Sequence, residues 1–158
     1  MIKRFYPQND KVLNFNFVQN DEDFIVEEQA IKFSGNGSFL VLKVEKANCD
    51  TWELIDRLAK FLNVFSNEIG YAGLKDKRAT TIQYITIPKK YSKEIKLFRS
   101  KKIQILDTFL HNAKLNIGDL EGNRFKINLH NVEIEDINHI QKILKIITRD
   151  GMPNYFGY

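Results

Sequence analysis

The sequence contains a single cysteine, Cys49, and no apolar run that approaches the length of a membrane span. A lone cysteine excludes an internal disulfide framework and fits a reducing cytosol, so we expect a cytoplasmic protein. We interpret Cys49 itself as a small buried or half-buried side chain rather than a reactive thiol. The first five residues, Met-Ile-Lys-Arg-Phe, lack the apolar core of a signal peptide. We therefore expect no membrane association.

The sequence also lacks the motifs that hold common cofactors. It has neither a Gly-rich phosphate loop nor the glycine pattern of a dinucleotide-binding fold. Its three histidines, His111, His130 and His139, are too scattered, from one another and from Cys49, to indicate a zinc site. We therefore predict a function that needs neither a metal nor a nucleotide cofactor.

What is present suits a folded domain with an uneven charge. At 158 residues and 43% hydrophobic content, the chain is large enough for one globular domain with a core. Residues 75–102 carry ten Lys or Arg against two acids, whereas residues 21–28 carry five acids and no base. A basic middle beside an acidic segment favours a surface that faces a polyanion. Many soluble proteins have such a stripe without binding nucleic acid, so this support is weak by itself.

The hydrophobic pattern predicts a mixed fold. Asp50 with Glu53 three residues later has the spacing of a helix-capping box, and an apolar stripe follows at helical spacing. We expect Trp52 and Phe61 to be packing residues on that helix. Further helices are predicted near residues 91–98 and 137–147, the latter ending at Gly151. Strands are predicted at residues 14–19, 24–26, 38–44, 81–87, 103–106 and 124–130. The predicted class is α+β, with a mostly antiparallel sheet flanked by helices on one side.

We expect the rest of the chain to be organised around residues 70–81, Gly-Tyr-Ala-Gly-Leu-Lys-Asp-Lys-Arg-Ala-Thr-Thr. The two glycines suggest a sharp turn that presents Asp76 on a loop before a strand. The cations Lys75, Lys77 and Arg78 favour the charged carboxylate and attract a polyanion. From the charge pattern alone, a solvated loop in which Asp76 balances its neighbours is the commoner meaning.

Residues 70–79 resemble the catalytic motif of the TruD family of tRNA pseudouridine synthases, whose nucleophilic aspartate matches Asp76. Three other segments resemble family motifs in the same order along the chain. They are residues 23–28 (Asp-Phe-Ile-Val-Glu-Glu), residues 111–125 with His-Asn-Ala-Lys and Gly-Asn-Arg-Phe, and residues 151–157 with Pro-Asn-Tyr-Phe-Gly. Together the four segments span most of the chain, which makes the combination specific.

The resemblance implies a pseudouridine synthase fold and the conversion of a tRNA uridine, at position thirteen, to pseudouridine. Asp76 would act on the ribose, either as nucleophile or by removing a ribose proton. The resemblance further implies that Asn123 helps to set the site and that Phe125 stacks on the base. Without it, the face that Phe125 shares with Ile127 and Leu129 favours a core position. The predicted phosphate contacts come from Lys75, Lys77 and Arg78, with Lys89 and Lys90.

Two departures from the family pattern affect the interpretation. A lysine that the family often places before the first motif is replaced by Val18, so Lys75, Arg78 or another cation would have to supply its charge. Family members are also about twice this length or more. We therefore expect residues 1–158 to be the N-terminal part of a catalytic domain, without the TruD-specific insert and the returning C-terminal segment. The alternatives are a non-catalytic basic RNA-binding module and a structural or protein-binding domain; the sequence does not indicate an oligomeric state.

Overall fold

The computed structural model of the chain describes residue 13 and residues 15–151. The predicted motif at residues 153–157 lies outside these described residues. The chain divides into two compact units, residues 18–128 and residues 1–17 with 129–158. No helix among the described residues is long and apolar enough to cross a membrane.

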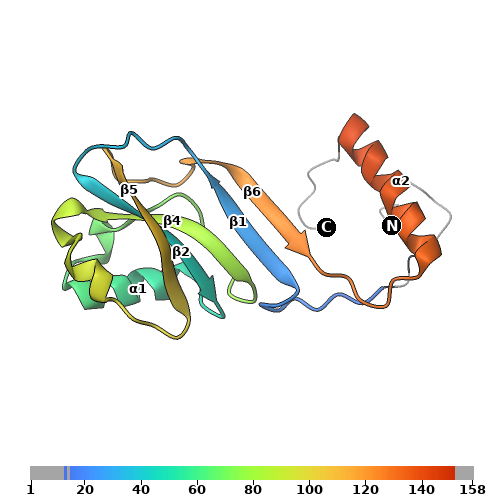
Figure 1. The fold of residues 1–158 in the computed structure, drawn as a ribbon, viewed down its shortest axis with the longest axis horizontal. Coiled ribbons are helices and arrows are strands. Elements are labelled where there is room, and N and C mark those ends of the chain that lie inside the picture. Colours follow the sequence, from blue (N-terminus) through green and yellow to red (C-terminus); the bar gives the residue numbers. More distant parts are fainter. Residues whose placement is uncertain (1–12, 14, 152–158) are drawn as a thin grey trace, which may run out of the picture. The chain divides into compact units, whose positions relative to one another are not determined.

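The unit of residues 18–128 is built on a six-stranded sheet (Figure 1). Its strands are β1 (Phe24–Ala30), β2 (Phe39–Ala47), β3 (Gly70–Tyr71), β4 (Thr80–Pro88), β5 (Ile103–His111) and β6 (Leu120–Ile127). Its helical segments are α1 (Thr51–Leu62) and three 3₁₀ turns, η1 (Ser66–Glu68), η2 (Lys89–Tyr91) and η3 (Glu94–Leu97). The strand order is β5-β2-β4-β1-β6, with β3 paired to β4 off this path.

The pairing is mostly antiparallel. Only β1 and β4 run parallel, in a short register from Ile25 opposite Thr80 to Glu27 opposite Ile82. The β2–β4, β2–β5, β1–β6 and β3–β4 pairs are all antiparallel. A parallel neighbour needs a long crossover, and here α1 and β2 lie in the chain between β1 and β4. The predicted α+β class with a mostly antiparallel sheet is confirmed.

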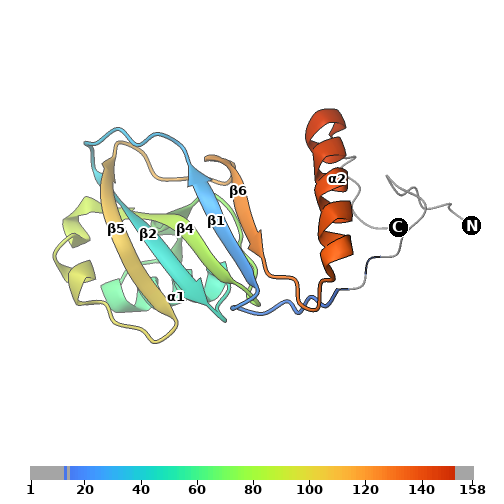
Figure 2. The same ribbon diagram turned by 45° about the vertical axis from the view of Figure 1, so that its right-hand side comes forward.

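Helix α1 covers one half of a sheet face (Figures 1 and 2). The Asp50 carboxylate accepts a hydrogen bond from the Glu53 amide at 2.8 Å, which caps the helix as its sequence predicts. The apolar stripe of α1 is buried against inward residues of β2, β4 and β5. Full burial of one large apolar side chain stabilises the fold by about 1.5–3 kcal/mol. Among the described residues, this core cluster includes none from β1 or β6. The half of the face formed by β1 and β6 therefore lies outside this core cluster.

Some predicted elements differ in the structure. The strand predicted at residues 14–19 is wrong for its described part, where Asn16 forms only an isolated bridge with His130. Within residues 15–151, no strand continues that pairing, so alternation alone produces no ladder there. The helical stretch near residues 91–98 consists of two 3₁₀ turns. Strand β5 continues to His111 because β2 provides partners up to that residue, with one register shift that leaves Leu106 unpaired.

The second unit contains helix α2 (Ile134–Asp150). The helix ends where the sequence predicts, at Gly151, whose φ of 79° is in the region that favours glycine. The Gly151 amide donates to the Ile147 carbonyl at 2.9 Å and so closes the last turn. Exposed apolar side chains on α2 include Ile134, Ile137 and Leu144.

Candidate active site

The loop of residues 72–79, between β3 and β4, is fastened by Lys75. The Lys75 amide donates to the Thr51 hydroxyl at 2.9 Å, and Thr51 is the first residue of α1. The Lys75 ammonium donates to the Glu28 carboxylate at 2.6 Å. Both side chains of this ion pair are buried, with 4% and 1% of their surface exposed. The loop is therefore tied to the helix by its main chain and to β1 by its side chain.

The other attachment of the loop comes from Lys46 near the end of β2. The Lys46 ammonium donates to the Asp76 carbonyl at 3.2 Å and also to the Cys49 carbonyl. Burial of this side chain lowers the pKa of Lys46 to about 8. Cys49 is fully buried, as we predicted. The main chain of Asp76 thus rests on a buried cation.

The Asp76 side chain itself is exposed, although the residue before it is buried. Within the described part of the chain, its carboxylate has no hydrogen bond and no ion pair. The residues that hold the loop therefore act through Lys75 and through the Asp76 carbonyl, and they leave the carboxylate available to a substrate. The main chain at Asp76 is therefore fixed by the protein, whereas its carboxylate is free to contact a bound group.

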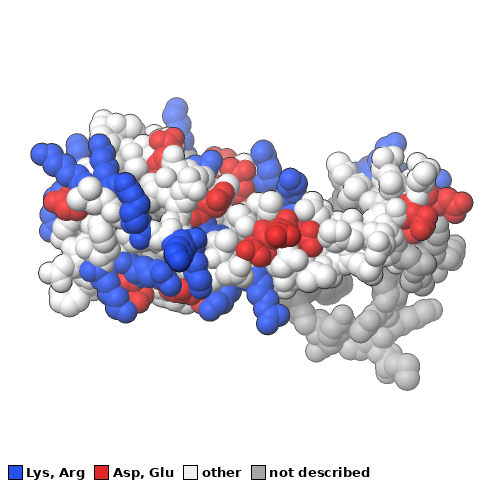
Figure 3. Space-filling view, turned by 60° about the horizontal axis from the view of Figure 1, so that its bottom comes forward, with Lys and Arg blue, Asp and Glu red and all other residues white. Residues whose placement is uncertain are grey.

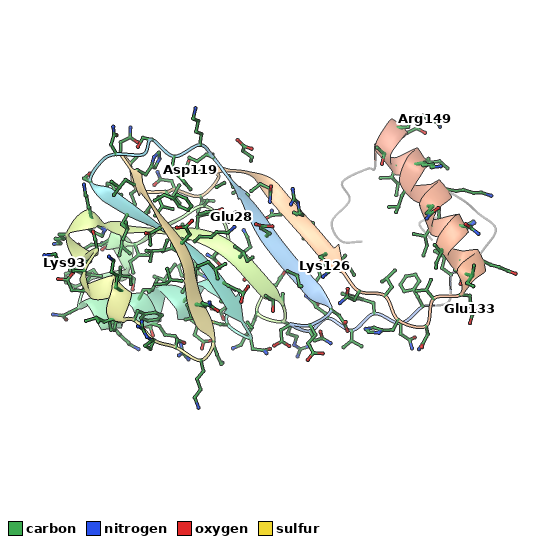
Figure 4. The ribbon with its side chains drawn as sticks, in the orientation of Figure 1. Glu28, Lys93, Asp119, Lys126, Glu133 and Arg149 are labelled. Atoms are coloured by element: carbon green, nitrogen blue, oxygen red, sulfur yellow. The ribbon has the colours of Figure 1, made fainter. Side chains whose placement is uncertain are left out.

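Strand β6 brings two predicted site residues to the face on which the loop is held. Directly paired residues of antiparallel strands project to the same face, and the register pairs Glu28 with Asn123 and Val26 with Phe125. Figure 4 shows Glu28 among the strands of the sheet. Its carboxylate accepts the hydrogen bond from Lys75 of the loop. Asn123 is exposed, as is 57% of Phe125. The loop, Asn123 and Phe125 therefore share one face.

The structure contradicts the interpretation of Phe125 as a core residue. Its ring stacks on that of Phe24, with centroids 6.1 Å apart and planes at 18°, and its other face has no ring partner among the described residues. Ile127, two residues further, is 49% exposed. The alternation predicted the shared face correctly, but among the described residues no helix covers it. An exposed aromatic ring on that face is open to stacking with a base.

The three loop residues among the predicted phosphate-binding cations differ in their surroundings. Lys75 is buried in its pair with Glu28, which does not agree with its predicted contact to a substrate. Lys77 is exposed and lies 3.7 Å from the Glu53 carboxylate. Arg78 is exposed and has no hydrogen bond or ion pair with another described residue. A hydrogen bond from Arg57, with the charges of Lys102 and Lys77, lowers the pKa of Glu53.

The basic segment predicted from the sequence is a surface feature. Nine of its ten cations are exposed, all but Lys75. Figure 3 shows Lys and Arg side chains gathered over much of one face of the sheet-bearing unit, with Asp and Glu side chains among them. The nine are Lys77, Arg78, Lys89, Lys90, Lys93, Lys96, Arg99, Lys101 and Lys102.

Two aromatic residues expected to be packed are largely exposed. Trp52 is 58% exposed and touches the Tyr71 ring edge-on at 5.6 Å, and Phe61 is 42% exposed against Phe98. Each ring packs against an aromatic neighbour, as expected of a packing residue, but the exposure of both rings was not suggested by the sequence pattern. Trp52 and Tyr71 line a cavity of about 610 Å³ with Lys114.

Sequence reasoning missed several residues beneath the loop. Glu28 was noted only as part of a motif, and Lys46, Thr51 and Gln83 were not singled out. Thr51 accepts from Lys75 and donates to Gln83, which is fully buried. The signal was present in the alternation, because Lys46 follows the inward-facing Leu42 and Val44 at the same spacing.

The sequence profile of the family described as "tRNA pseudouridine synthase D (TruD)" matches residues 4–158. This chain belongs to the TruD family. Among curated relatives, the tRNA pseudouridine synthase D of Wolinella succinogenes is 44% identical over 158 residues, and that of Sulfurimonas denitrificans is 44% identical over 156. The resemblance recognised in the sequence motifs is therefore confirmed.

A crystal structure shows the same fold in a TruD relative. The putative tRNA pseudouridine synthase D from Methanosarcina mazei superimposes with a TM-score of 0.83 at 32% identity. The match covers 98% of this chain and 36% of that protein. The alignments with the Wolinella and Sulfurimonas relatives likewise cover 99% and 98% of this chain, but 44% of each relative. The TruD chain described here thus spans less than half the length of the relatives it matches.

Proposed function

We propose that the protein containing this chain converts a uridine of tRNA to pseudouridine, and that Asp76 is the carboxylate that acts on the ribose. The observation that carries the proposal is an exposed carboxylate on a loop fixed from below by Lys75 and Lys46. Membership of the TruD family supports the reaction class. The uridine at position thirteen of tRNA is the target that the family resemblance implies.

The reaction makes few demands on the protein. The bond between ribose C1′ and uracil N1 breaks, and C1′ bonds to C5. The proton on C5 is lost and N1 gains one, so the atoms balance without an oxidant or a reductant. What the step requires is one ionised carboxylate at the sugar and a surface that holds the freed uracil while it turns.

The described residues can be given roles in that step. Asp76 attacks C1′ or removes a ribose proton, and the exposed ring of Phe125 stacks on the uracil. Asn123, exposed on the same face, donates or accepts a hydrogen bond at the site. Lys77 and Arg78 bind phosphates beside the flipped nucleotide, which offsets a few kcal/mol of unstacking.

The test uses tRNA that carries tritium at C5 of its uridines, because the proposed step releases that hydrogen to water. The protein expressed from the complete gene should release tritium, and Asp76→Asn should release none while binding tRNA as tightly as before. Asp107→Asn is the matched control, since Asp107 is an exposed aspartate on β5. Full turnover by Asp76→Asn would refute the assignment of the carboxylate.

The exposed cations favour a second candidate function, a non-catalytic RNA-binding module. Each phosphate contact adds roughly one unit to the slope of log affinity against log salt concentration. Salt-dependent tRNA binding by the protein without any tritium release would favour this module over the enzyme. Absence of RNA binding at low salt would argue against both.

A further inference from the structure

Lys46 is an unusual residue to find inside this fold. It faces the core side of the sheet near the end of β2, opposite Thr81 of β4 and Ile103 of β5. Only 1% of its surface is exposed, and it is the largest fully buried side chain of the described residues. Taking an ammonium group out of water costs free energy unless other groups compensate. The contacts of Lys46 should therefore explain its presence.

Those contacts are with main-chain carbonyls. The ammonium donates to the carbonyl oxygens of Cys49 and Asp76. Among the described residues, it forms no ion pair with a carboxylate. The titratable groups that face it are Cys49 and Asp50 at the start of α1, and Lys75 and Asp76 in the loop. One of its two partners is thus the residue proposed to perform the chemistry.

The other cations near the loop are committed elsewhere or point to solvent. The charge of Lys75 is paired with that of Glu28 in a buried ion pair. Arg78 is exposed, and Val18 stands where the family pattern led us to expect a lysine. Lys46 is the buried cation that contacts Asp76 from behind. A charge in that position acts through protein rather than through water, so solvent screens it less.

We propose that Lys46 is a positioning residue for Asp76, which holds its main chain and keeps a positive charge behind its carboxylate. The proposal rests on the proposed function, because it assigns Lys46 a part in the same reaction. Lys46 does not touch the substrate. It fixes the direction from which Asp76 meets the ribose, and its charge favours the ionised carboxylate once tRNA has displaced water from the site.

A purely structural role would make a different prediction. If Lys46 only satisfied two carbonyls, a neutral amine would serve as well as an ammonium, because it still donates hydrogen bonds. The proposed role requires the charge, and burial brings the pKa of Lys46 to about 8. The rate of tritium release should therefore decline as the pH rises through about 8 while the protein stays folded.

The experiment compares wild type, Lys46→Arg, Lys46→Met and the exposed-lysine control Lys60→Met in the protein from the complete gene. Single-turnover rates are measured between pH 6.5 and 9.5, with circular dichroism of each sample. Arginine stays charged throughout this range, so Lys46→Arg should lose the alkaline decline. Lys46→Met should slow the reaction on the order of 10²-fold at neutral pH, the effect of a misplaced group, without weakening tRNA binding. Lys60→Met should behave as wild type.

The outcomes separate the two proposals. If wild type releases no tritium, the proposed function fails. If wild type is active but Lys46→Met keeps its rate, or Lys46→Arg declines at the same pH as wild type, the role of Lys46 is refuted. If Lys46→Met does not fold, the wild-type and Lys46→Arg profiles still decide, because above pH 8 the arginine keeps its charge whereas Lys46 loses it. A flat wild-type profile overturns the proposal without any variant.

Discussion

Replacing Glu28 by glutamine should destabilise the chain far more than a surface mutation would. The Glu28–Lys75 pair has an oxygen–nitrogen distance of 2.6 Å and is almost fully buried. Glutamine can still accept the hydrogen bond that the Tyr84 amide gives to Glu28 at 3.1 Å. It leaves the Lys75 ammonium buried without a counter-charge. Removing one partner of a buried pair costs about 3–5 kcal/mol.

The loss can be measured as a change in melting temperature or in the urea midpoint of the 158-residue chain. For a chain of this size, each kcal/mol corresponds to about 2–4 °C, so Glu28→Gln should lower the melting temperature by roughly 6–20 °C. Glu27→Gln is the matched control on the same strand. Glu27 lies 3.2 Å from Lys43 in a partly exposed pair, and breaking it should cost less than about 1 kcal/mol.

The double variant Glu28→Leu with Lys75→Met tests the reason for the loss. It removes both charges and leaves the Tyr84 amide without its acceptor, at about 1–3 kcal/mol. Because a buried pair can be replaced by apolar groups at little cost, the double variant should be more stable than Glu28→Gln. A double variant less stable than the single one, or a Glu28→Gln protein as stable as wild type, would refute the reasoning.

Three further predictions concern stability, each measured by urea unfolding. Asp76→Asn should change the free energy of unfolding by less than about 0.5 kcal/mol, since its carboxylate forms no hydrogen bond or ion pair with the described residues; a larger loss would mean that it holds the loop. Asp50→Ala should cost about 1 kcal/mol through loss of the α1 cap; no loss would contradict the cap's contribution. Burial lowers the pKa of Lys46 from 10.5 to about 8, so the unfolded chain binds more protons between these values. Wild type should therefore gain up to about 3 kcal/mol relative to Lys46→Met as pH rises from 8 to 10.5; a constant difference would contradict the shift.

Local patterns predicted the elements that have strong periodicity. The capping residue Asp50 and the apolar spacing that follows it are properties of the chain itself, and α1 forms where they indicate. Strand β4 was predicted within a residue at each end, because the segment is rich in β-branched and aromatic residues and is followed by Pro88. Such local features determine whether a segment forms a helix or a strand, but they do not determine whether its side chains are buried.

The environment of a side chain depends on what covers it, and periodicity does not reveal that. Phe125 and Val44 each lie between two charged neighbours, yet α1 covers only the half of the sheet that contains Val44. Trp52 lies at the start of a well-predicted helix and is nevertheless largely exposed. A special role for Lys46 and Gln83 could have been suspected from the sequence, because each is a polar residue at the end of an inward-facing apolar series. Their partners come from distant segments and were not predictable.

Trp52 gives the chain a built-in optical reporter. It is the single tryptophan of the sequence, and it stands next to Thr51, whose hydroxyl holds the Lys75 amide. The tryptophan fluorescence therefore comes from one known position. The wavelength of its emission maximum depends on how much water surrounds the indole. Any displacement of the loop that carries Asp76 should change that emission, so the motion can be timed in unlabelled protein by stopped-flow mixing.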